Sequence, residues 1–213
     1  MIELGGIRRL EALQAITDAA LAHLTLDNLL DELLDRIRAL LHVDTAAILM
    51  FDEQRGQLVA RAAKGLEEEV ERGVTIPVGR GFAGRIAAER RPLAIDDVDH
   101  ADILNPLLRE KGVRSLLGVP LVVNARVIGV LHIGTLVERR FTASDEELLQ
   151  AVGDRAALAI EHARAFEAER RARHEAEQTA ARLERLQVVT EASLAHLGLD
   201  RLLAELLGRI DSL

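Results

Sequence analysis

Apolar residues recur every three or four positions in two stretches near the start of the chain. The first stretch covers residues 7–24, and the second covers 27–41, where the leucines and Ile37 share one stripe. Such spacing puts the apolar side chains on a single face of a helix. The pattern therefore predicts two amphipathic helices, the second with Asp27 as its N-cap.

After Asp44 the chain changes to short aliphatic and β-branched runs separated by turn residues. Residues 45–65 predict a hairpin that turns at 52–56, and residues 115–135 predict a clearer hairpin that turns at 124–126. Each hairpin joins its strands through a short turn, which indicates antiparallel pairing.

The segment between the two hairpins mixes short strands with short helices. Residues 74–97 predict a strand, a glycine-rich turn, a short helix and a second strand, and residues 99–112 predict a loop with a short helix broken by Pro106. The strands do not alternate with long helices. The order of elements therefore predicts an α+β fold in which helices cover a sheet.

A long helical segment follows the second hairpin, with Thr142 or Ser144 as its cap. The stretch between Asp154 and Leu197 contains neither glycine nor proline. A helix over 144–197 would be roughly 80 Å long at about 1.5 Å per residue. A domain of this size has no core of that length, so part of the helix needs another partner or remains solvated.

The apolar residues of this helix are separated by alternating steps of three and four, as in a coiled-coil seam. The seam thins to alanines over 167–182 and resumes after a shift in register. A single solvated helix and a self-paired parallel coiled coil both fit, and the seam on both sides of the polar stretch favours the coiled coil. The candidate dimer-interface residues are Leu149, Val152, Ala156, Ala159, Ala163, Phe166, Leu183 and Leu186.

The end of the chain repeats its beginning. Residues 10–37 and 183–210 align without a gap, and 19 of the 28 aligned positions are identical. We therefore expect a repeated module whose second copy is cut short. The expected organisation is a sensory domain over 1–166, a coiled-coil linker helix over 167–197 and the truncated start of a second domain over 198–213.

Composition excludes several classes of protein. Only 2% of the residues are aromatic, with no Trp or Tyr, so the core must be aliphatic. The net charge of −8 argues against a nucleic-acid surface. The absence of cysteine excludes disulfides, iron–sulfur sites, thiol catalysis and thioether-linked bilin chromophores. No apolar run approaches the roughly 20 residues of a membrane span, so we expect a cytoplasmic chain without membrane insertion.

Three stretches together resemble the GAF domain family of small-molecule sensory modules. They are residues 76–97, 115–134 and 141–167, and the resemblance extends over roughly 8–166. It implies a six-stranded antiparallel sheet with terminal helices on one face and a ligand pocket on the other face, beneath short helices. It also implies tandem arrangement and homodimers formed through the terminal helices.

The resemblance implies a function in signalling. We expect a non-catalytic sensory and dimerisation module of a multidomain bacterial protein, in which the long helix passes the ligand state to an output domain such as a histidine kinase or a serine phosphatase. A ligand-free dimerisation scaffold is the alternative. The pocket candidates by position are Phe82, Ile86, Asp96, Ile103, Leu107, Leu117 and His132, whose mainly apolar character suggests a small, mostly non-ionic ligand.

The glycines at positions 79, 81 and 84 match the G-x-G-x-x-G fingerprint of dinucleotide-binding proteins. That motif needs a βαβ unit, and the rest of the chain supplies none. The expected role of these glycines is a tight turn and close packing of the helix over 82–89 on the sheet.

Phe141 and Asp145 match half of a motif found in cyclic-nucleotide-binding GAF domains. The Asn and Lys of the other half correspond approximately to Thr135 and Leu136, so we expect Asp145 to lack an ion-pair partner and cyclic-nucleotide binding to be the less favoured alternative. Phe141 is then expected to be a hydrophobic anchor, and Asp145 a charge in the first turn of the helix.

Metal, haem and catalytic sites find little support in the sequence. Only His100 and His132 are placed to reach a pocket, and residues 108–117 lack the axial histidine that haem-binding relatives carry there. The acidic residues between 96 and 102 are expected to serve in turns and caps rather than hold a cation. GAF domains that reduce free methionine sulfoxide need cysteines, so that activity is not expected.

Overall fold

The computed structural model describes residues 25–210, without the side chains of most residues beyond 185. The chain divides into two compact units, residues 1–165 and 166–213. The helix expected over 7–24 lies outside the described residues, and so do residues 10–24 of the first repeat copy. Within them, no helix is both long enough and apolar enough to cross a membrane.

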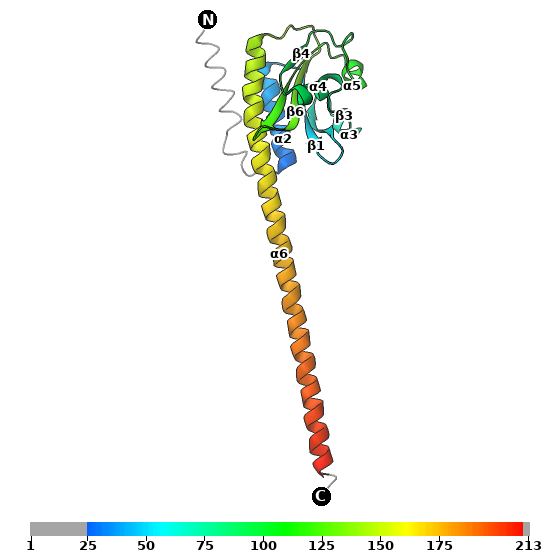
Figure 1. Ribbon diagram of the computed structural model, residues 1–213, viewed down its shortest axis with the longest axis vertical. Coiled ribbons are helices and arrows are strands. Elements are labelled where there is room, and N and C mark those ends of the chain that lie inside the picture. The colour runs from blue at the N-terminus through cyan, green and yellow to red at the C-terminus, as the bar shows by residue number, and fades with distance from the viewer. Residues whose placement is uncertain (1–24, 211–213) are drawn as a thin grey trace. The chain divides into compact units, whose positions relative to one another are not determined.

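The first unit is built on one six-stranded antiparallel sheet (Figure 1). The strand order across the sheet is β3-β2-β1-β6-β5-β4. The first and last of these strands, β1 and β6, therefore pair at the centre of the sheet. The six strands are β1 (Thr45–Asp52), β2 (Gln57–Lys64), β3 (Thr75–Pro77), β4 (Leu93–Ile95), β5 (Ser115–Val123) and β6 (Arg126–Thr135).

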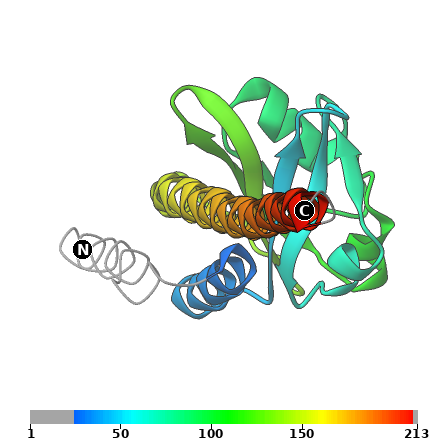
Figure 2. The same cartoon turned by 90° about the horizontal axis from the view of Figure 1, so that it is seen from below.

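Helices cover both faces of this sheet, so the expected α+β class and the six-stranded antiparallel sheet are confirmed. One face packs against α2 and the start of α6, which lie on the same side of the sheet in Figure 2. The other face packs against the short helices and the loops between them. The helices are α2 (Leu26–Leu41), α3 (Glu68–Glu71), α4 (Gly81–Glu89), α5 (Pro106–Glu110) and α6 (Ala143–Ile210).

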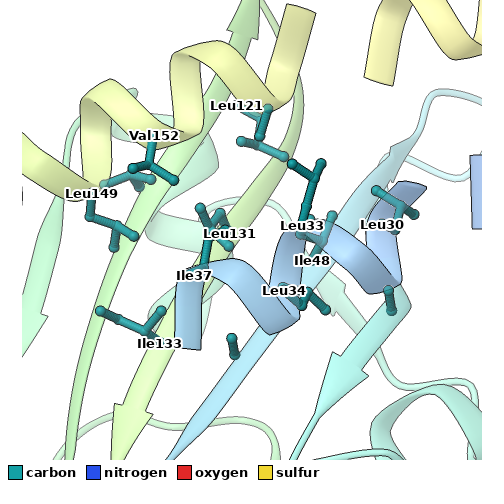
Figure 3. Packing of buried hydrophobic residues seen from close by; sticks show 14 of the residues in the cluster. Leu30, Leu33, Leu34, Ile37, Ile48, Leu121, Leu131, Ile133, Leu149 and Val152 are labelled. Carbon is teal, nitrogen blue, oxygen red and sulfur yellow. The ribbon is translucent and has the colours of Figure 1, made fainter. Parts of the chain in front are cut away.

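The core under α2 and α6 is aliphatic, as the composition requires. Figure 3 shows Leu33 and Ile37 of α2 packed with Leu131 of β6 and with Leu149 and Val152 of α6. All five of these side chains are completely or almost completely buried. Burial of each large aliphatic side chain contributes about 1.5–3 kcal/mol, so this face contributes substantially to the stability of the unit.

The burial of α6 in this core changes the expected dimer interface. Leu149, Val152 and Ala156 are fully enclosed within their own domain, in the same cluster as α2 and the sheet. Their predicted place in an intermolecular seam is wrong, because a side chain covered inside one chain cannot contact a second. The three-and-four spacing that suggested a coiled coil here is the apolar stripe of a helix lying on a sheet.

The helix starts also differ in detail from the prediction. Thr25, not Asp27, caps α2, and its hydroxyl accepts a hydrogen bond from the Asn28 amide at 3.5 Å. Of the two candidates at α6, Thr142 is the cap: its hydroxyl accepts from the Asp145 amide, while the Asp145 carboxylate accepts from the Thr142 amide at 2.8 Å. This reciprocal pair is a capping box, which satisfies amides that a helix start leaves free.

The structure corrects two local predictions, the role of Pro106 and the extent of the second hairpin turn. Pro106 does not break a helix but begins α5, where its missing N–H costs nothing and Asn105 supplies the cap. The β5–β6 hairpin turns at Asn124 and Ala125, both with positive φ, and Arg126 already belongs to β6. Positive φ at both central positions is the two-residue hairpin turn that matches strand twist.

α6 is a single helix of 68 residues. It runs on through Gly198 and Asp200, where the truncated second module was expected to begin. In the alignment of the two repeat copies, Gly198 corresponds to Thr25, whose hydroxyl caps α2. Gly198 has no side chain to accept such a bond.

Candidate ligand-binding site

The site lies on the sheet face opposite α2, around His132 of β6. The neighbours of His132 across the sheet are Ala47 on β1 and Gly118 on β5, two of the smallest side chains. This leaves a hollow in the sheet face, which the rings of Phe82 and His132 enter edge to face with their centroids 6.1 Å apart. The small neighbours are therefore what makes room for a polar ring in an aliphatic core.

The glycines before α4 bring that helix close to the sheet. Gly79 and Gly81 adopt positive φ, and a Cβ on Gly84 would lie 2.2 Å from the carbonyl oxygen of Pro77. The Gly79 amide in turn donates to the Gly84 carbonyl at 2.7 Å. Turn formation and close packing thus account for all three glycines of the fingerprint.

Three polar side chains meet in this otherwise apolar core. Asn105 Nδ2 donates to Glu69 Oε1 at 2.6 Å, and the other carboxylate oxygen, Oε2, lies 3.7 Å from Nε2 of His132. Glu69, Asn105 and His132 are all at least nine-tenths buried. Among the described residues, neither Glu69 Oε2 nor His132 Nδ1 has a hydrogen-bond partner. A buried carboxylate with an unsatisfied oxygen is costly, so this cluster needs an explanation beyond packing.

Local structure fixes two of the three groups. Glu69 sits in the short helix α3, and the Val74 amide donates to its backbone carbonyl at 2.9 Å. Asn105 caps α5, because its Oδ1 accepts from the Leu107 amide at 3.1 Å while its Nδ2 holds Glu69. The amide of Asn105 therefore ties α3 and α5 together over the sheet.

The cluster faces a small cavity. The space that the centre of a water molecule can occupy is about 20 Å³, which is enough for about one water. Most of the wall is aliphatic or aromatic. It is formed by Leu49, Glu69, Ile76, Phe82, Ala83, Ile103, Leu104, Asn105, Leu108 and His132.

The loop before α5 closes the outer side of the cavity. Leu104 is the one lining residue that is substantially exposed, and it packs on Gly81, where a Cβ would lie 2.8 Å from its Cγ. Arg109 holds the same loop, since its guanidinium donates to the carbonyl of Ala101 at 2.7 Å and to that of Val98 at 3.3 Å. Leu104 is therefore the side chain that a ligand would have to pass.

The structure brings three of the seven predicted pocket residues to the cavity: Phe82, Ile103 and His132. Ile86 belongs to the same core but does not line the cavity, and Leu107 is buried in α5 without reaching it.

Two of the predicted pocket residues lie elsewhere. Leu117 points to the opposite face and packs in the core with α2, because neighbouring residues of a strand alternate between faces, and Leu116 takes the predicted side. Asp96 is exposed and lies 4.0 Å from Arg140. Both assignments to the pocket are wrong.

The prediction missed Glu69 and Asn105, two of the three polar residues in the cavity wall. Glu69 is the last of three consecutive glutamates, a pattern typical of a solvated surface. One signal was available: Glu69 follows the apolar Leu66 by three positions, the spacing of residues on one face of a helical turn. Asn105 directly precedes a proline, as helix caps often do.

The half-motif at Phe141 and Asp145 has the structural role expected of it. Phe141 is buried in the core with α2, and Asp145 closes the capping box. The expectation that Asp145 lacks an ion partner is wrong, because Arg139 Nη2 lies 2.9 Å from its carboxylate. Burial alone would raise the pKa of Asp145, but the bonds from Thr142 and the charge of Arg139 outweigh burial and lower that pKa.

The acidic residues after β4 act in turns and ion pairs. Asp97 accepts from the Asp99 amide at 3.0 Å and pairs with His100 at 2.7 Å, while Asp99 pairs with Arg114. His100 is largely exposed and does not reach the cavity. Among the described residues, no three histidine or acidic side chains lie close enough together to hold a metal ion.

Comparison with known proteins places these features in a family. The GAF domain family model matches residues 25–160. The GAF domain of a phosphoenolpyruvate-protein phosphotransferase from Coxiella burnetii is 25% identical, with a TM-score of 0.67 over 76% of this chain and 98% of its own. A domain of a putative two-component sensor histidine kinase from Sinorhizobium meliloti is 28% identical, with a TM-score of 0.56 over 68% of this chain and 96% of its own.

Two curated relatives show the range of proteins that carry similar sequence. The formate hydrogenlyase transcriptional activator of Salmonella typhimurium is 25% identical over 169 residues, which is 73% of this chain and 23% of the activator. The free methionine-R-sulfoxide reductase of Escherichia coli is 39% identical over 77 residues, which is 36% of this chain and 46% of the reductase. The chain spans about a quarter of the length of the first curated relatives it matches.

Proposed function

The chain belongs to the GAF domain family, which consists mainly of sensory and regulatory modules of signalling proteins, and from this premise we propose that it is a non-catalytic small-molecule sensor. In this proposal the cavity between the sheet and α4 receives the ligand. α6 then carries the ligand state to an output domain of the same polypeptide, of the histidine kinase or serine phosphatase type.

The unsatisfied polar cluster in the cavity is the observation that carries the proposal. A domain whose only task was to be stable would gain nothing from burying Glu69 and His132 with free hydrogen-bonding atoms. Such groups are typical of a site that a ligand completes. The exposed Leu104 at the cavity wall and the loop clasped by Arg109 provide an element that can open without disturbing the aliphatic core.

α6 supports the signalling part of the proposal. Its first turns belong to the core, through Leu149 and Val152, and the same helix continues beyond the first unit. Because the helix is continuous, a change in how those turns pack on the sheet would also displace the residues farther along it. In this proposal the ligand shifts the equilibrium between two packing arrangements of these turns.

We further propose that the chain forms a homodimer through the part of α6 that its own core leaves uncovered. Phe166 and Leu183 are about half exposed, and Ala159 and Ala163 are only partly buried. An isolated helix with this composition gains stability mainly from packing an apolar face. The eighth predicted interface residue, Leu186, has no described side chain.

Light scattering tests the dimer at tens of micromolar. Leu183→Glu is expected to convert the dimer to a monomer, whereas Leu136→Glu, at an exposed leucine outside α6, is expected to leave it intact. A wild-type chain that is monomeric at this concentration contradicts the dimer and leaves the sensor proposal standing.

A ligand-free dimerisation scaffold is the second candidate, and the size of the cavity favours it. A space for about one water holds no metabolite unless the loop around Leu104 moves. A metabolite library screened by protein-observed NMR separates the two functions, with Ile103 and His132 as reporters inside the cavity. Compounds that shift both reporters support the sensor, and a cavity that none of them enters supports the scaffold.

The proposal of a non-catalytic role has a chemical basis. The relative from Escherichia coli is a free methionine-R-sulfoxide reductase, so a related sequence does serve an enzyme. The present chain contains no cysteine and can provide no thiol to reduce a sulfoxide. An assay of the purified chain with free methionine-R-sulfoxide and a thiol reductant is expected to show no turnover.

A further inference from the structure

Only one of the two carboxylate oxygens of Glu69 accepts a hydrogen bond from the described residues. Glu69 lines the cavity, and its Oε1 accepts from Asn105 Nδ2 at 2.6 Å, while its buried Oε2 has no hydrogen bond from the described residues. Nε2 of His132 is 3.7 Å from this oxygen, which is beyond hydrogen-bonding distance. A carboxylate oxygen only accepts, so the group that completes it must bring an N–H or O–H donor.

The charge around the cavity favours a cationic donor. None of the ten lining residues is a lysine or an arginine, so no permanent positive charge in the wall balances Glu69. Nδ1 of His132 also has no hydrogen-bond partner among the described residues. A buried carboxylate in such surroundings is stabilised most by a cation with which it forms a hydrogen bond.

The remaining wall specifies the rest of the ligand. Leu49, Ile76, Phe82, Ile103 and Leu108 surround the polar cluster with hydrocarbon. The present space accepts only the charged head group, and the body of a ligand would displace Leu104, the exposed residue of the wall. A second anion would meet both the charge of Glu69 and an apolar lining, so carboxylates and phosphates do not fit.

We propose that the cavity recognises a small organic cation, a primary ammonium group that donates to Glu69 Oε2 and carries a short hydrocarbon body against the apolar wall. This inference rests on the proposed sensory function and adds the chemical class of the ligand. Asn105 is a positioning residue, because it donates to the other oxygen of the Glu69 carboxylate and caps the start of α5. Ligand entry moves the Leu104 segment, which Arg109 ties to α5.

The test uses three probes of equal carbon number on the wild-type 213-residue chain: n-butylammonium, butan-1-ol and butanoate at pH 7. Binding is followed by NMR from the methyl signals of Ile103 and the ring nitrogens of His132. n-Butylammonium is expected to bind at least ten-fold more tightly than butan-1-ol, and butanoate is expected not to bind. This comparison needs no variant and is independent of any effect of mutation on folding.

Variants then assign the preference to one side chain. Glu69→Gln is expected to abolish the ten-fold preference for the ammonium probe, while Glu71→Gln, an exposed glutamate of the same helix, is expected to keep it. Leu104→Ala is expected to raise the affinity for n-butylammonium several-fold by widening the entrance.

The outcomes separate this inference from the function on which it rests. If butan-1-ol or butanoate shifts the two reporters at least as strongly as n-butylammonium, the ligand class is overturned while the cavity remains a binding site. If no probe shifts them even in Leu104→Ala, the ammonium inference fails, and the metabolite screen above decides the sensory function separately. A preference that survives in Glu69→Gln also overturns the assignment to Glu69.

Discussion

The two faces of the central sheet are built from the same strands but are covered by different kinds of structure. On one face, α2 and the start of α6 supply continuous apolar stripes that meet the sheet through aliphatic side chains, among them Leu33 and Val152. On the other face, helices of four, nine and five residues and their loops do the covering. These short pieces leave a cavity and bury Glu69, Asn105 and His132.

The difference shows how one sheet can combine stability with a binding site. Long helices bury many aliphatic side chains at once and suit a face whose task is cohesion. Short helices joined by loops bury less and move more easily, so polar groups there can be exposed to a ligand without loss of the main core. We therefore expect the face with the candidate site to contribute less to stability.

The largest expected effect tests this unequal division directly. Leu33→Ala in α2 is expected to lower the free energy of unfolding by about 3 kcal/mol, because the tightly packed helix face cannot close the cavity that remains. Leu108→Ala in α5 is expected to cost about 2 kcal/mol, since the adjacent loops can relax. Urea unfolding of both variants measures the difference, and a larger loss at Leu108 would reverse the comparison.

The second prediction concerns the polar cluster: Asn105→Ala is expected to lower the free energy of unfolding by about 2 kcal/mol. Asn105→Ala removes the cap of α5 and leaves a buried carboxylate oxygen of Glu69 without its donor. In a Glu69→Gln background the same substitution is expected to cost only about 1 kcal/mol, because the stranded group no longer carries a charge. Equal costs in the two backgrounds, measured by urea unfolding, would show that Glu69 and Asn105 are not coupled.

A third prediction examines how closely α4 approaches the sheet. Gly118→Ala is expected to destabilise the domain by about 1.5 kcal/mol, because the new Cβ would lie 2.6 Å from Ile86 Cδ1 and 2.9 Å from Phe82 Cζ. Adding Ile86→Val removes the nearer atom and is expected to recover part of the loss. Thermal unfolding of the single and double variants checks this, and a neutral Gly118→Ala would indicate that α4 is free to shift.

The smallest effect concerns the attachment of α6 to its own face. Asp145→Asn weakens the capping box and the pair with Arg139, and it is expected to cost about 1 kcal/mol at pH 7. The folded state lowers the pKa of Asp145 below its ordinary value of 3.8, so its ionisation stabilises the fold above that pH and ceases to do so as the pH falls through the lowered pKa. Unfolding measured from pH 7 to pH 2 should show the two proteins converging at the acidic end. A constant difference would assign the effect to the cap alone.

Hydrophobic patterning predicted most of the fold because the strands and long helices follow it closely. The hairpins from Thr45 to Lys64 and from Ser115 to Thr135 were recognised from their β-branched runs and turn residues, and both are present. It was harder to predict which residues of a strand buried on both faces point to which side of the sheet. Leu116 and Leu117 are equally apolar, and only the pairing register decides which of them faces the cavity.

The candidate site was only partly predictable, for two physical reasons. Glu69 resembles a surface glutamate, and its burial depends on Asn105, which is 36 residues away in the chain. The seam through Leu149 and Val152 has the same spacing whether the partner is a sheet or another helix, so periodicity alone does not identify what covers it. Both cases depend on contacts between segments distant in sequence.

The pairing of β1 with β6 has a consequence for how the domain reaches this structure. Thr45 and Gly134 are Cα partners, so the two central strands can join only after the whole intervening chain has been made and brought together. The entropy lost in closing such long loops must be overcome before these contacts form, and this slows folding. During synthesis, the leucines of α2 therefore emerge long before the strand that completes their cover, and the nascent chain is most vulnerable to aggregation in that interval.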